Sequence, residues 1–385
     1  MLHLLHMENE NFKRSIDLQA NLKERSHFLF GPRATGKSWL IKHQLPDAQV
    51  FDLLDFEIYE RFLLRPKSLS EEINNNLIVI DEIQKIPKLL DEVHRLIESK
   101  NYKFLLTGSS ARKLKRGGAN LLAGRARSLE LFPITMSEMS NFKLDSYLNT
   151  GGLPFILNSD RPMLDLKTYV NLYIKEEIQA EALVRNIDQF MRFLDLFGHI
   201  SGKELNLQEI ASDSGVPART VANFIEILKD TLLAFELEPY RITKKRKAIS
   251  KSKIYIFDVG VAGHMAGRGQ ITSKSELYGD AFEHFCLQEI RARLSYTQND
   301  LKMYYWRTQK GEFEVDCILG NEMAIEIKSS DRFQEKYLKG LKALREEGLV
   351  KRYILISRDP IKRLVDGIEV IPYDLFLKSL SETKF

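Results

Sequence analysis

The apolar positions divide the chain into three stretches with different periods. From His27 to about residue 150, short apolar runs that suit buried strands alternate with segments whose apolar residues recur at helical spacing. Residues 162–240 are almost entirely of helical period, and strand-like runs return from Lys253 onward. We therefore expect three domains, at residues 1–150, 151–250 and 251–385.

The first stretch predicts a parallel sheet with helices on both faces. Its expected strands are apolar and partly β-branched, as is typical of strands buried on both sides. Helical segments between them give the strand–helix alternation of an α/β fold. The expected strands lie at 28–30, 49–53, 77–80 and 103–106, with helices from 37 onward and at 89–99.

Composition narrows the class of protein. Apolar residues make up 44% and charged residues 29% of the 385 residues, which is ordinary for a soluble globular chain. Two cysteines are too few for a disulfide framework, and the first residues lack the pattern of a signal peptide. No apolar run reaches the roughly 18 residues of a membrane span. We therefore expect a cytoplasmic protein without a membrane segment, and the net charge of +4 names no partner by itself.

The sequence GPRATGKS at residues 31–38 matches the phosphate-binding pattern G-x-x-x-x-G-K-[ST] in full. An expected strand precedes it and an expected helix follows. The glycines let backbone N–H groups surround phosphate oxygens, the lysine reaches the β- and γ-phosphates, and the hydroxyl is a ligand for Mg²⁺. We therefore predict ATP and Mg²⁺ as cofactors. The expected binding residues are Gly31, Pro32, Arg33, Ala34, Thr35, Gly36, Lys37 and Ser38, with Ser38 also holding the metal ion.

A second motif, LIVIDEIQK, places two acidic residues at the end of a buried strand. We expect Asp81 to hold Mg²⁺ through its water shell and Glu82 to orient and deprotonate the attacking water. The alternative is that the two residues simply open a helix, where the helix dipole favours negative charge. The phosphate-binding loop upstream favours the catalytic interpretation.

Two further segments carry candidate groups for the γ-phosphate. In FLLTGSSARKL, a strand between those of the first two motifs would place Thr107 or Ser109 beside the γ-phosphate as a polar sensor. In LLAGRARSLELFP, Arg125 is a candidate to neutralise charge in the transition state, in the same chain or across a subunit interface. The alternatives are a plain turn capped by Ser109 or Ser110 and a solvent-facing arginine.

Together these segments resemble one family, the prokaryotic AAA-type ATPases that carry a C-terminal domain of unknown function. GPRATGKS, VIDEIQK, LLTGSSARKL and LAGRARSLELFPIT stand in the order of that family, and GGLP at 151–154 resembles its domain junction. IYIFDVGVAG, GDAFEHF, YYWRTQKGEFEVD and AIEIKSS extend the resemblance over nearly the whole chain. It implies ATP roles for Lys37, Ser38, Asp81 and Glu82, and Arg33 lies inside the loop as the family pattern has it.

The helical stretch contains a helix-turn-helix pattern at residues 206–229. A short helix over 207–212 is followed by a turn in which Gly215 suits a left-handed backbone, and Pro217 opens the second helix. We therefore expect a helical, winged-helix middle domain.

Two features of this region point to DNA as a partner. Arg219, Thr220 and Asn223 lie near the start of the second helix on its exposed side, where such residues can read a major groove. The run 241–253, RITKKRKAISKSK, is basic and has no acidic residue, as expected of a wing or arm on phosphate. The alternatives are a domain that packs on the ATPase or binds protein, and a solvated lysine loop.

The segment EFEVDCILGNEMAIEIKSS carries a second group of charged residues. Glu326 and Lys328 are two apart and therefore share one face of an expected strand. With Asp316 on the preceding strand and Glu283 on an upstream helix, they resemble the PD-(D/E)xK nuclease core. That resemblance implies a restriction-endonuclease-like α/β domain whose carboxylates hold Mg²⁺ while the lysine helps to activate water. The alternative is a sheet whose charged residues line its wet side.

The turn between the two strands decides whether Asp316 can join Glu326. A two-residue turn at 320–321 would place Asp316 opposite Ile325, pointing away from Glu326. A three-residue loop at 320–322, or one bulge, shifts the register so that the two carboxylates face each other. We predict the second case, and carboxylates on opposite faces of the sheet would exclude the metal site.

The favoured function is an ATPase that couples its nucleotide state to a winged-helix and nuclease-like module acting on DNA. Two other classes stay open. One is an ATP-gated, Mg²⁺-dependent DNA nuclease, and the other is a nucleotide-switched binding module with little turnover. Whether the chain forms a homo-oligomer also stays open.

Overall fold

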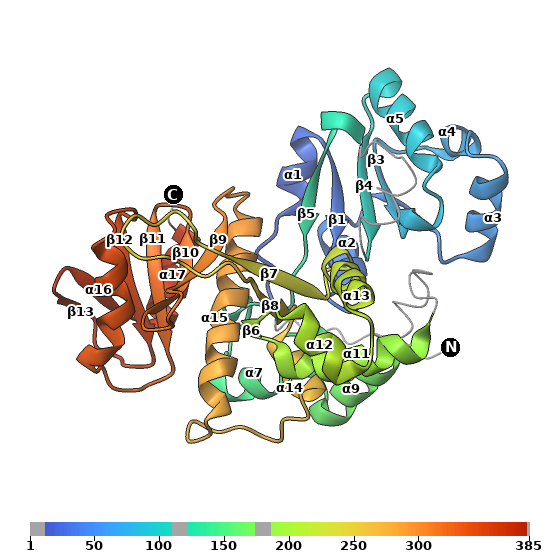
Figure 1. Cartoon of the computed structure of the whole chain (residues 1–385). Coiled ribbons are helices and arrows are strands. Elements are labelled where there is room, and N and C mark those ends of the chain that lie inside the picture. The colour runs from blue at the N-terminus through green and yellow to red at the C-terminus, as the bar shows by residue number, and fades with distance from the viewer. Residues whose placement is uncertain (1–11, 110–121, 174–185, 383–385) are drawn as a thin grey trace.

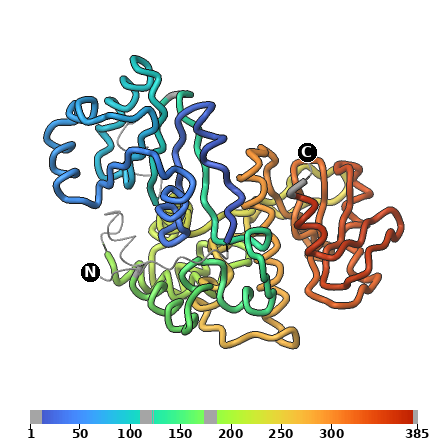
Figure 2. Tube along the Cα trace, turned by 180° about the vertical axis from the view of Figure 1, so that it is seen from behind, coloured from blue at the N-terminus to red at the C-terminus, as the bar shows by residue number. Residues whose placement is uncertain are grey.

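The computed structural model describes residues 12–109, 122–173 and 186–382, which form two sheets with helices packed around them (Figure 1). The first sheet belongs to the N-terminal part, and the second joins the middle and C-terminal parts. Seen from behind, the N-terminal part in blue and the C-terminal part in red lie at opposite ends, with the green and yellow middle part between them (Figure 2). This arrangement is a mixed α/β fold.

The N-terminal sheet has five strands in the order β2-β3-β4-β1-β5, and all neighbouring pairs are parallel. Parallel strands end at the same edge, so the residues that follow β1, β3 and β4 are neighbours in space. This topology is consistent with a P-loop NTPase-like domain. The strands are Ser26–Phe30 (β1), Gln49–Asp52 (β2), Leu77–Asp81 (β3), Lys103–Gly108 (β4) and Ala126–Glu130 (β5).

Both faces of this sheet are buried, as predicted. Alternate residues of β3 and β4 point to opposite faces, so Ile78 and Phe104 join the core beneath α5 while Val79 and Leu105 join the core that includes Leu40 of α2. The helices are Leu18–Glu24 (α1), Lys37–Gln44 (α2), Phe56–Leu64 (α3), Ser68–Glu72 (α4) and Leu89–Lys100 (α5), with 3₁₀ turns at Ile83–Lys85 (η1) and Leu122–Gly124 (η2).

The middle part begins with short helices and contains the two helices predicted near 206–229. Asn206 caps α12 by accepting a hydrogen bond from the Glu209 N–H, and Gly215 ends that helix in the left-handed region at φ 63°. Pro217 then opens α13. The elements are Met136–Glu138 (η3), Leu144–Thr150 (α7), Pro154–Leu157 (α8), Pro162–Thr168 (α9), the π-helical turn Tyr169–Tyr173 (η4), Ile187–Ile200 (α11), Leu207–Ser214 (α12), Ala218–Asp230 (α13) and Val259–Met265 (α14).

The structure corrects the expectation that residues 162–240 are almost all helical. Lys203–Glu204 (β6) and Ala234–Pro239 (β7) are strands, and both pair antiparallel with Lys253–Ile256 (β8). In β7 the sequence AFELEP alternates apolar and polar residues, which suits a strand with one buried face. The predicted boundary near residue 250 falls between β7 and β8, so the hairpin of the middle part extends beyond it.

The second sheet runs through the middle and C-terminal parts without a break. Its order is β13-β14-β12-β11-β10-β9-β7-β8-β6, and β7 joins β9 through the parallel pairs Glu238–Tyr304 and Pro239–Tyr305. Helices α15 and α17 contribute to the core on one face and α16 to the core on the other. The remaining elements are Leu277–Tyr296 (α15), Met303–Arg307 (β9), Glu314–Leu319 (β10), Met323–Lys328 (β11), Glu335–Leu338 (η5), Lys339–Arg345 (α16), Arg352–Ser357 (β12), Arg363–Val365 (β13), Ile368–Pro372 (β14) and Tyr373–Glu382 (α17).

Candidate functional site

The loop at residues 31–38 lies between the end of β1 and the start of α2. Ala34 and Gly36 both have positive φ, 68° and 94°, which curls the backbone back toward the helix. At Gly31, a Cβ atom would lie 2.5 Å from the carbonyl oxygen of Leu131. Only glycine fits that position, because the first residue of the loop packs directly against the segment that follows β5.

The side chain of Lys37 lies inside this loop. It is only 8% exposed, and its Nζ donates hydrogen bonds to the carbonyl oxygens of Gly31 at 2.6 Å and Pro32 at 3.2 Å. The Thr35 hydroxyl also donates to the Pro32 carbonyl, at 2.8 Å. The ammonium group is therefore held at the loop, where it can meet the negative charge of a phosphate.

Three parallel strands bring the polar groups of the two motifs together. Ser38 Oγ is 3.4 Å from Asp81 Oδ2, and the Thr107 hydroxyl, at the end of β4, donates to Asp81 Oδ1. Hydroxyl and carboxylate oxygens are the ligands that Mg²⁺ prefers. Ser38 and Asp81 therefore fit a magnesium ion, and β4 lies between β1 and β3 as predicted.

Glu82 follows in a left-handed backbone conformation, φ 59° and ψ 41°, which is unusual for a residue with a side chain. Its N–H group lies 3.2 Å from Asp81 Oδ1 and 3.3 Å from Thr107 Oγ1. Its carboxylate accepts a hydrogen bond from Gln84 Nε2, and the same nitrogen is 3.5 Å from Ser109 Oγ. The structure thus brings Ser109 to the neighbourhood of Glu82.

Sequence reasoning missed Gln84. Its signal was present in IDEIQK, where a polar residue follows the acidic pair within a short turn. The burial of that residue, at 5% exposure, depends on the chain folding back over it and is not visible in the local sequence.

The structure does not bring Arg125 to the phosphate-binding loop of the same chain. β5 pairs with β1 from Ser26–Ala126 to Phe30–Glu130, so Arg125 lies at the start of β1 whereas the loop follows its end. The Arg125 guanidinium pairs with Glu98 of α5. This position corrects the expectation of a contact within one chain, and a contact across a subunit interface stays a prediction.

The middle part covers the outside of the loop. The Tyr169 hydroxyl donates to the Arg33 carbonyl at 3.0 Å, and Ala34 packs against the core of the middle helices. The ring of Pro154 lies 3.6 Å from where a Cβ atom on Gly36 would be. A change in the backbone conformation of the loop would therefore alter its contacts with the middle part.

The residues predicted to contact DNA divide into two groups. On α13, Arg219 and Asn223 are exposed and Thr220 is half-buried. The basic run 241–253 does not stand beside α13 as a free arm, because its backbone is tied to the C-terminal part. The buried Glu347 carboxylate accepts from the N–H groups of Lys244 and Lys245, both at 2.7 Å.

Within the basic run, only part of the charge faces solvent. Lys244, Lys245, Lys247 and Lys251 are exposed, whereas Lys253 is buried at 6% exposure. Lys253 therefore cannot serve as the surface phosphate contact that was expected of the whole run. Its Nζ lies 2.8 Å from a carboxylate oxygen of Glu314 and 3.4 Å from one of Glu283.

The predicted register of the C-terminal hairpin is observed. Leu319 pairs with Met323 across a three-residue loop, and Cys317 pairs with Ile325. This register puts Asp316 and Glu326 on the same face, and Asp316 Oδ2 accepts from the Ile327 N–H at 2.7 Å. Lys328 Nζ contacts both carboxylates, at 2.6 Å from Glu326 and 3.5 Å from Asp316.

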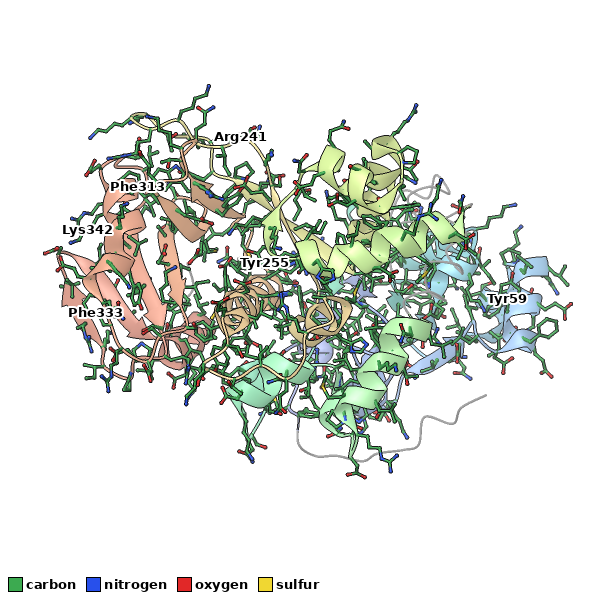
Figure 3. All side chains as sticks on the ribbon, turned by 60° about the horizontal axis from the view of Figure 1, so that its bottom comes forward. Tyr59, Arg241, Tyr255, Phe313, Phe333 and Lys342 are labelled. Atoms are coloured by element: carbon green, nitrogen blue, oxygen red, sulfur yellow. The ribbon has the colours of Figure 1, made fainter. Side chains whose placement is uncertain are left out.

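Glu283 is close to this group but is engaged elsewhere. Its carboxylate accepts from the Tyr255 hydroxyl at 2.7 Å and pairs with Lys253. Tyr255, labelled in Figure 3, lies at the centre of the molecule, beside α15. Within the described ranges, no three His, Cys, Asp or Glu side chains come together as a metal-binding group. The expected three-carboxylate metal site is therefore not formed in this arrangement.

The charges of this cluster perturb one another. Burial and the neighbouring Asp316 carboxylate raise the pKa of Glu326 well above its usual range. Burial also raises the pKa of Glu283, in spite of Lys253. Burial alone would lower the pKa of Lys328, but Asp316 and Glu326 raise it. The cluster thus favours protons on its buried carboxyl groups and keeps the Lys328 ammonium charged.

Three family models match successive parts of the chain. Residues 23–140 match the family model described as an AAA domain. Residues 141–272 and 278–376 match models described as domains of unknown function, DUF8612 and DUF4143. The chain thus combines a P-loop ATPase-like AAA domain, which indicates nucleotide binding, with a DUF4143 domain at its C-terminal side.

Individual proteins show the same similarity over most of the chain. The Mycobacterium tuberculosis protein Rv2008c is 26% identical over 330 residues, covering 81% of this chain and 73% of its own. The Methanocaldococcus jannaschii protein MJ1544 is 23% identical over 398 residues, covering 90% and 86%. A solved structure, protein VC1899 from Vibrio cholerae, is 12% identical and covers 92% and 96%, but its TM-score of 0.22 is too low to bear on the fold.

Two further properties follow from the described residues. Cys286 and Cys317 are free thiols, and both are buried. Among the helices of the described ranges, none combines the length and the apolar character that crossing a membrane requires.

Proposed function

We propose that this chain binds ATP with Mg²⁺ and hydrolyses it. The observation that carries the proposal is the convergence of the two motifs at one edge of the sheet. Lys37 Nζ is held inside the phosphate-binding loop, and Ser38 Oγ and Asp81 Oδ2 are 3.4 Å apart. An ammonium group, a hydroxyl and a carboxylate in this arrangement match what a magnesium nucleotide requires.

The groups around this edge have distinct expected roles. Lys37 neutralises charge on the β- and γ-phosphates, and Ser38 and Asp81 would hold the metal ion. Bound Mg²⁺ supplies positive charge that offsets the negative charge of the phosphate oxygens. Glu82 accepts a proton from the attacking water, and Ser109 donates a hydrogen bond toward the γ-phosphate. The Thr107 hydroxyl could take this role only by leaving Asp81, to which it donates.

The proposed output of the nucleotide state is the arrangement of the later domains. Support comes from the Tyr169–Arg33 hydrogen bond and from Ala34, which pack the loop against the middle part. The order α11, β6, α12, α13, β7, β8 is that of a winged helix, and we assign this fold to the middle part. Exposed Arg219 and Asn223, together with the exposed lysines of 244–251, fit DNA as the partner.

The test is an ATPase assay on the purified chain, with and without duplex DNA. Lys37→Ala should lose nucleotide binding and turnover, and Glu82→Gln should bind ATP but retain it without hydrolysis. Lys42→Ala is the matched control, because Lys42 is an exposed lysine on the same helix α2. An inactive wild-type chain that binds no ATP would refute the proposal. If Glu82→Gln leaves partner binding unchanged because the wild type scarcely turns over, the nucleotide-switched binding module replaces the ATPase.

A second candidate function is an ATP-gated, Mg²⁺-dependent DNA nuclease in the C-terminal domain. Asp316 and Glu326 lie on the same face beside Lys328, and among the described residues Glu326 Oε2 is a buried oxygen without a hydrogen-bond partner. Binding of Mg²⁺ would require Glu283 to leave Tyr255 and Lys253, because the three carboxylates do not come together in this arrangement. Glu326→Ala should abolish DNA cleavage and spare ATP turnover. Wild-type protein that leaves DNA intact in the presence of ATP and Mg²⁺ would exclude this function.

A further inference from the structure

Gln84 is a buried amide next to the proposed catalytic glutamate. It lies in η1, two residues after Glu82, and is 5% exposed. Its Nε2 donates to Glu82 Oε2 and lies 3.5 Å from Ser109 Oγ. Among the residues that the structure describes, its Oε1 has no hydrogen-bond partner. Buried amide oxygens are nearly always paired, so this one needs an explanation.

The chemistry of the amide fixes which end faces Glu82. A carboxylate only accepts hydrogen bonds, so the NH₂ group must face it, and the carbonyl oxygen is then the end that remains. Glu82 cannot easily turn away, because its left-handed backbone and its N–H contacts with Asp81 and Thr107 hold it at the end of β3. A carboxylate acceptor and an amide acceptor are thus fixed side by side at the carboxyl edge of the sheet.

Two neighbouring acceptors match the two hydrogens of one water molecule. We propose that Gln84 is a positioning residue for ATP hydrolysis, which holds the Glu82 carboxylate with its N–H group and the attacking water with its carbonyl oxygen. This inference rests on the proposed ATPase function, and it adds the residue that orients the water.

The step balances without a further reactant. The water oxygen bonds to the γ-phosphorus while the bond from phosphorus to the β–γ bridging oxygen breaks, and ADP leaves with that electron pair. One water proton passes to Glu82. The other stays on the new phosphate hydroxyl, which donates to Gln84 Oε1 until phosphate departs.

The competing explanation is that Gln84 only supports the turn after β3. A supporting residue would affect stability or nucleotide affinity, whereas a positioning residue affects the chemical step. Losing one hydrogen bond to a charged group should lower kcat about 10- to 100-fold, with the affinity for a fluorescent ATP analogue changed by no more than about twofold.

The experiment compares Gln84→Met and Gln84→Glu with the wild type and Lys37→Ala. Gln84→Met keeps the length of the side chain and removes both polar ends, and Gln84→Glu keeps the shape but replaces the donor by an acceptor. Both should lower kcat and move the acidic limb of the kcat–pH profile to higher pH, because Glu82 loses the donor that favours its ionised form. The matched control is Gln288→Met on α15, which should leave kcat unchanged. It removes a buried amide that donates to the Tyr147 hydroxyl and accepts from the Val259 N–H.

The outcomes separate the two proposals. A wild type that hydrolyses ATP no faster than Lys37→Ala refutes the ATPase function and this inference with it. A wild type that hydrolyses ATP, with Gln84 variants of wild-type kcat and pH profile, refutes the role of Gln84 alone. Variants that bind the analogue weakly but keep kcat at saturation would likewise overturn it, since Gln84 would then serve nucleotide binding.

Discussion

Replacing Asp258 by alanine should loosen the junction between the start of α14 and the GGLP turn at residues 151–154. Asp258 is fully buried and caps α14, with its Oδ1 accepting from the N–H groups of Gly260 at 2.9 Å and Val261 at 3.0 Å. Its other oxygen accepts from the N–H group of Gly152 at 2.8 Å. One carboxylate thus fixes both a helix start and the GGLP turn. It packs so closely that a Cβ atom on Gly151 would lie 1.9 Å from Asp258 Oδ1.

The size of the effect follows from these bonds. Loss of an aspartate helix cap costs about 1 kcal/mol. Leaving the buried Gly152 N–H group without its acceptor costs about 1–3 kcal/mol more. The excess over a simple cap loss is therefore about 2 kcal/mol, which corresponds to roughly 30-fold more frequent local opening.

Hydrogen exchange measured by mass spectrometry can resolve this excess without assuming that the whole chain unfolds in one step. In Asp258→Ala, peptides that contain residues 150–153 and 258–262 should exchange about 30-fold faster than the loss of a simple helix cap alone would make them. The matched control is Asp55→Ala, because Asp55 caps the exposed start of α3 through Glu57 and Ile58 and makes no bond to another domain. If Asp258→Ala accelerates exchange at its own helix only as much as Asp55→Ala does, the cross-link to Gly152 contributes nothing.

Three further changes have outcomes of a defined direction. Burial raises the pKa of Glu289 from 4.5 to about 8, so between these pH values the folded chain holds a proton that the unfolded chain has released. The free energy of unfolding should therefore fall by up to about 1.4 kcal/mol for each unit that the pH rises from 4.5 to 8. Urea titrations of Glu289→Gln should show that this slope is gone. Tyr169→Phe removes the hydrogen bond to the Arg33 carbonyl and should alter ATP affinity by about fivefold at most; an unchanged affinity and an unchanged response to DNA would dissociate the loop from the middle part. Glu347→Ala frees the backbone of 244–246 and should weaken binding of short duplex DNA about fivefold in fluorescence anisotropy, whereas equal affinity would exclude the exposed lysines as a DNA contact.

Local sequence predicts two kinds of element: strands that are buried on both faces, and turns or helix starts that a few neighbouring residues define. β3 and β4 lie in the middle of the sheet, so their apolar runs identify them directly. The second helix of the middle pair begins where Pro217 predicts, and the three-residue loop after Leu319 gives the hairpin register. For the turn and the helix start, the deciding contact is with a residue nearby in the chain.

The parts that escaped prediction depend on contacts from far along the chain. β5 is an edge strand of alternating and partly charged residues, and it became a strand because β1 offers a free edge. Lys253 reads as one more member of a basic run, yet it is buried because α15 brings Glu283 over it. Arg125 stands one residue before β5, and only the parallel register with β1 shows that it lies at the wrong end of the sheet for the γ-phosphate.

The proposed coupling of nucleotide binding to the later domains would pass through the contacts on the outside of the phosphate-binding loop. Pro154, beside Gly36, belongs to the turn whose Gly152 is bonded to Asp258, and the helix that Asp258 caps packs against α15. These contacts are contiguous, but contiguity alone is not coupling. The physical requirement is reciprocity: if DNA tightens ATP binding by some factor, ATP must tighten DNA binding by the same factor. Equal factors that disappear together in Asp258→Ala would place the coupling in this junction, whereas equal factors that survive it would place the coupling in the contact of Tyr169 with Arg33.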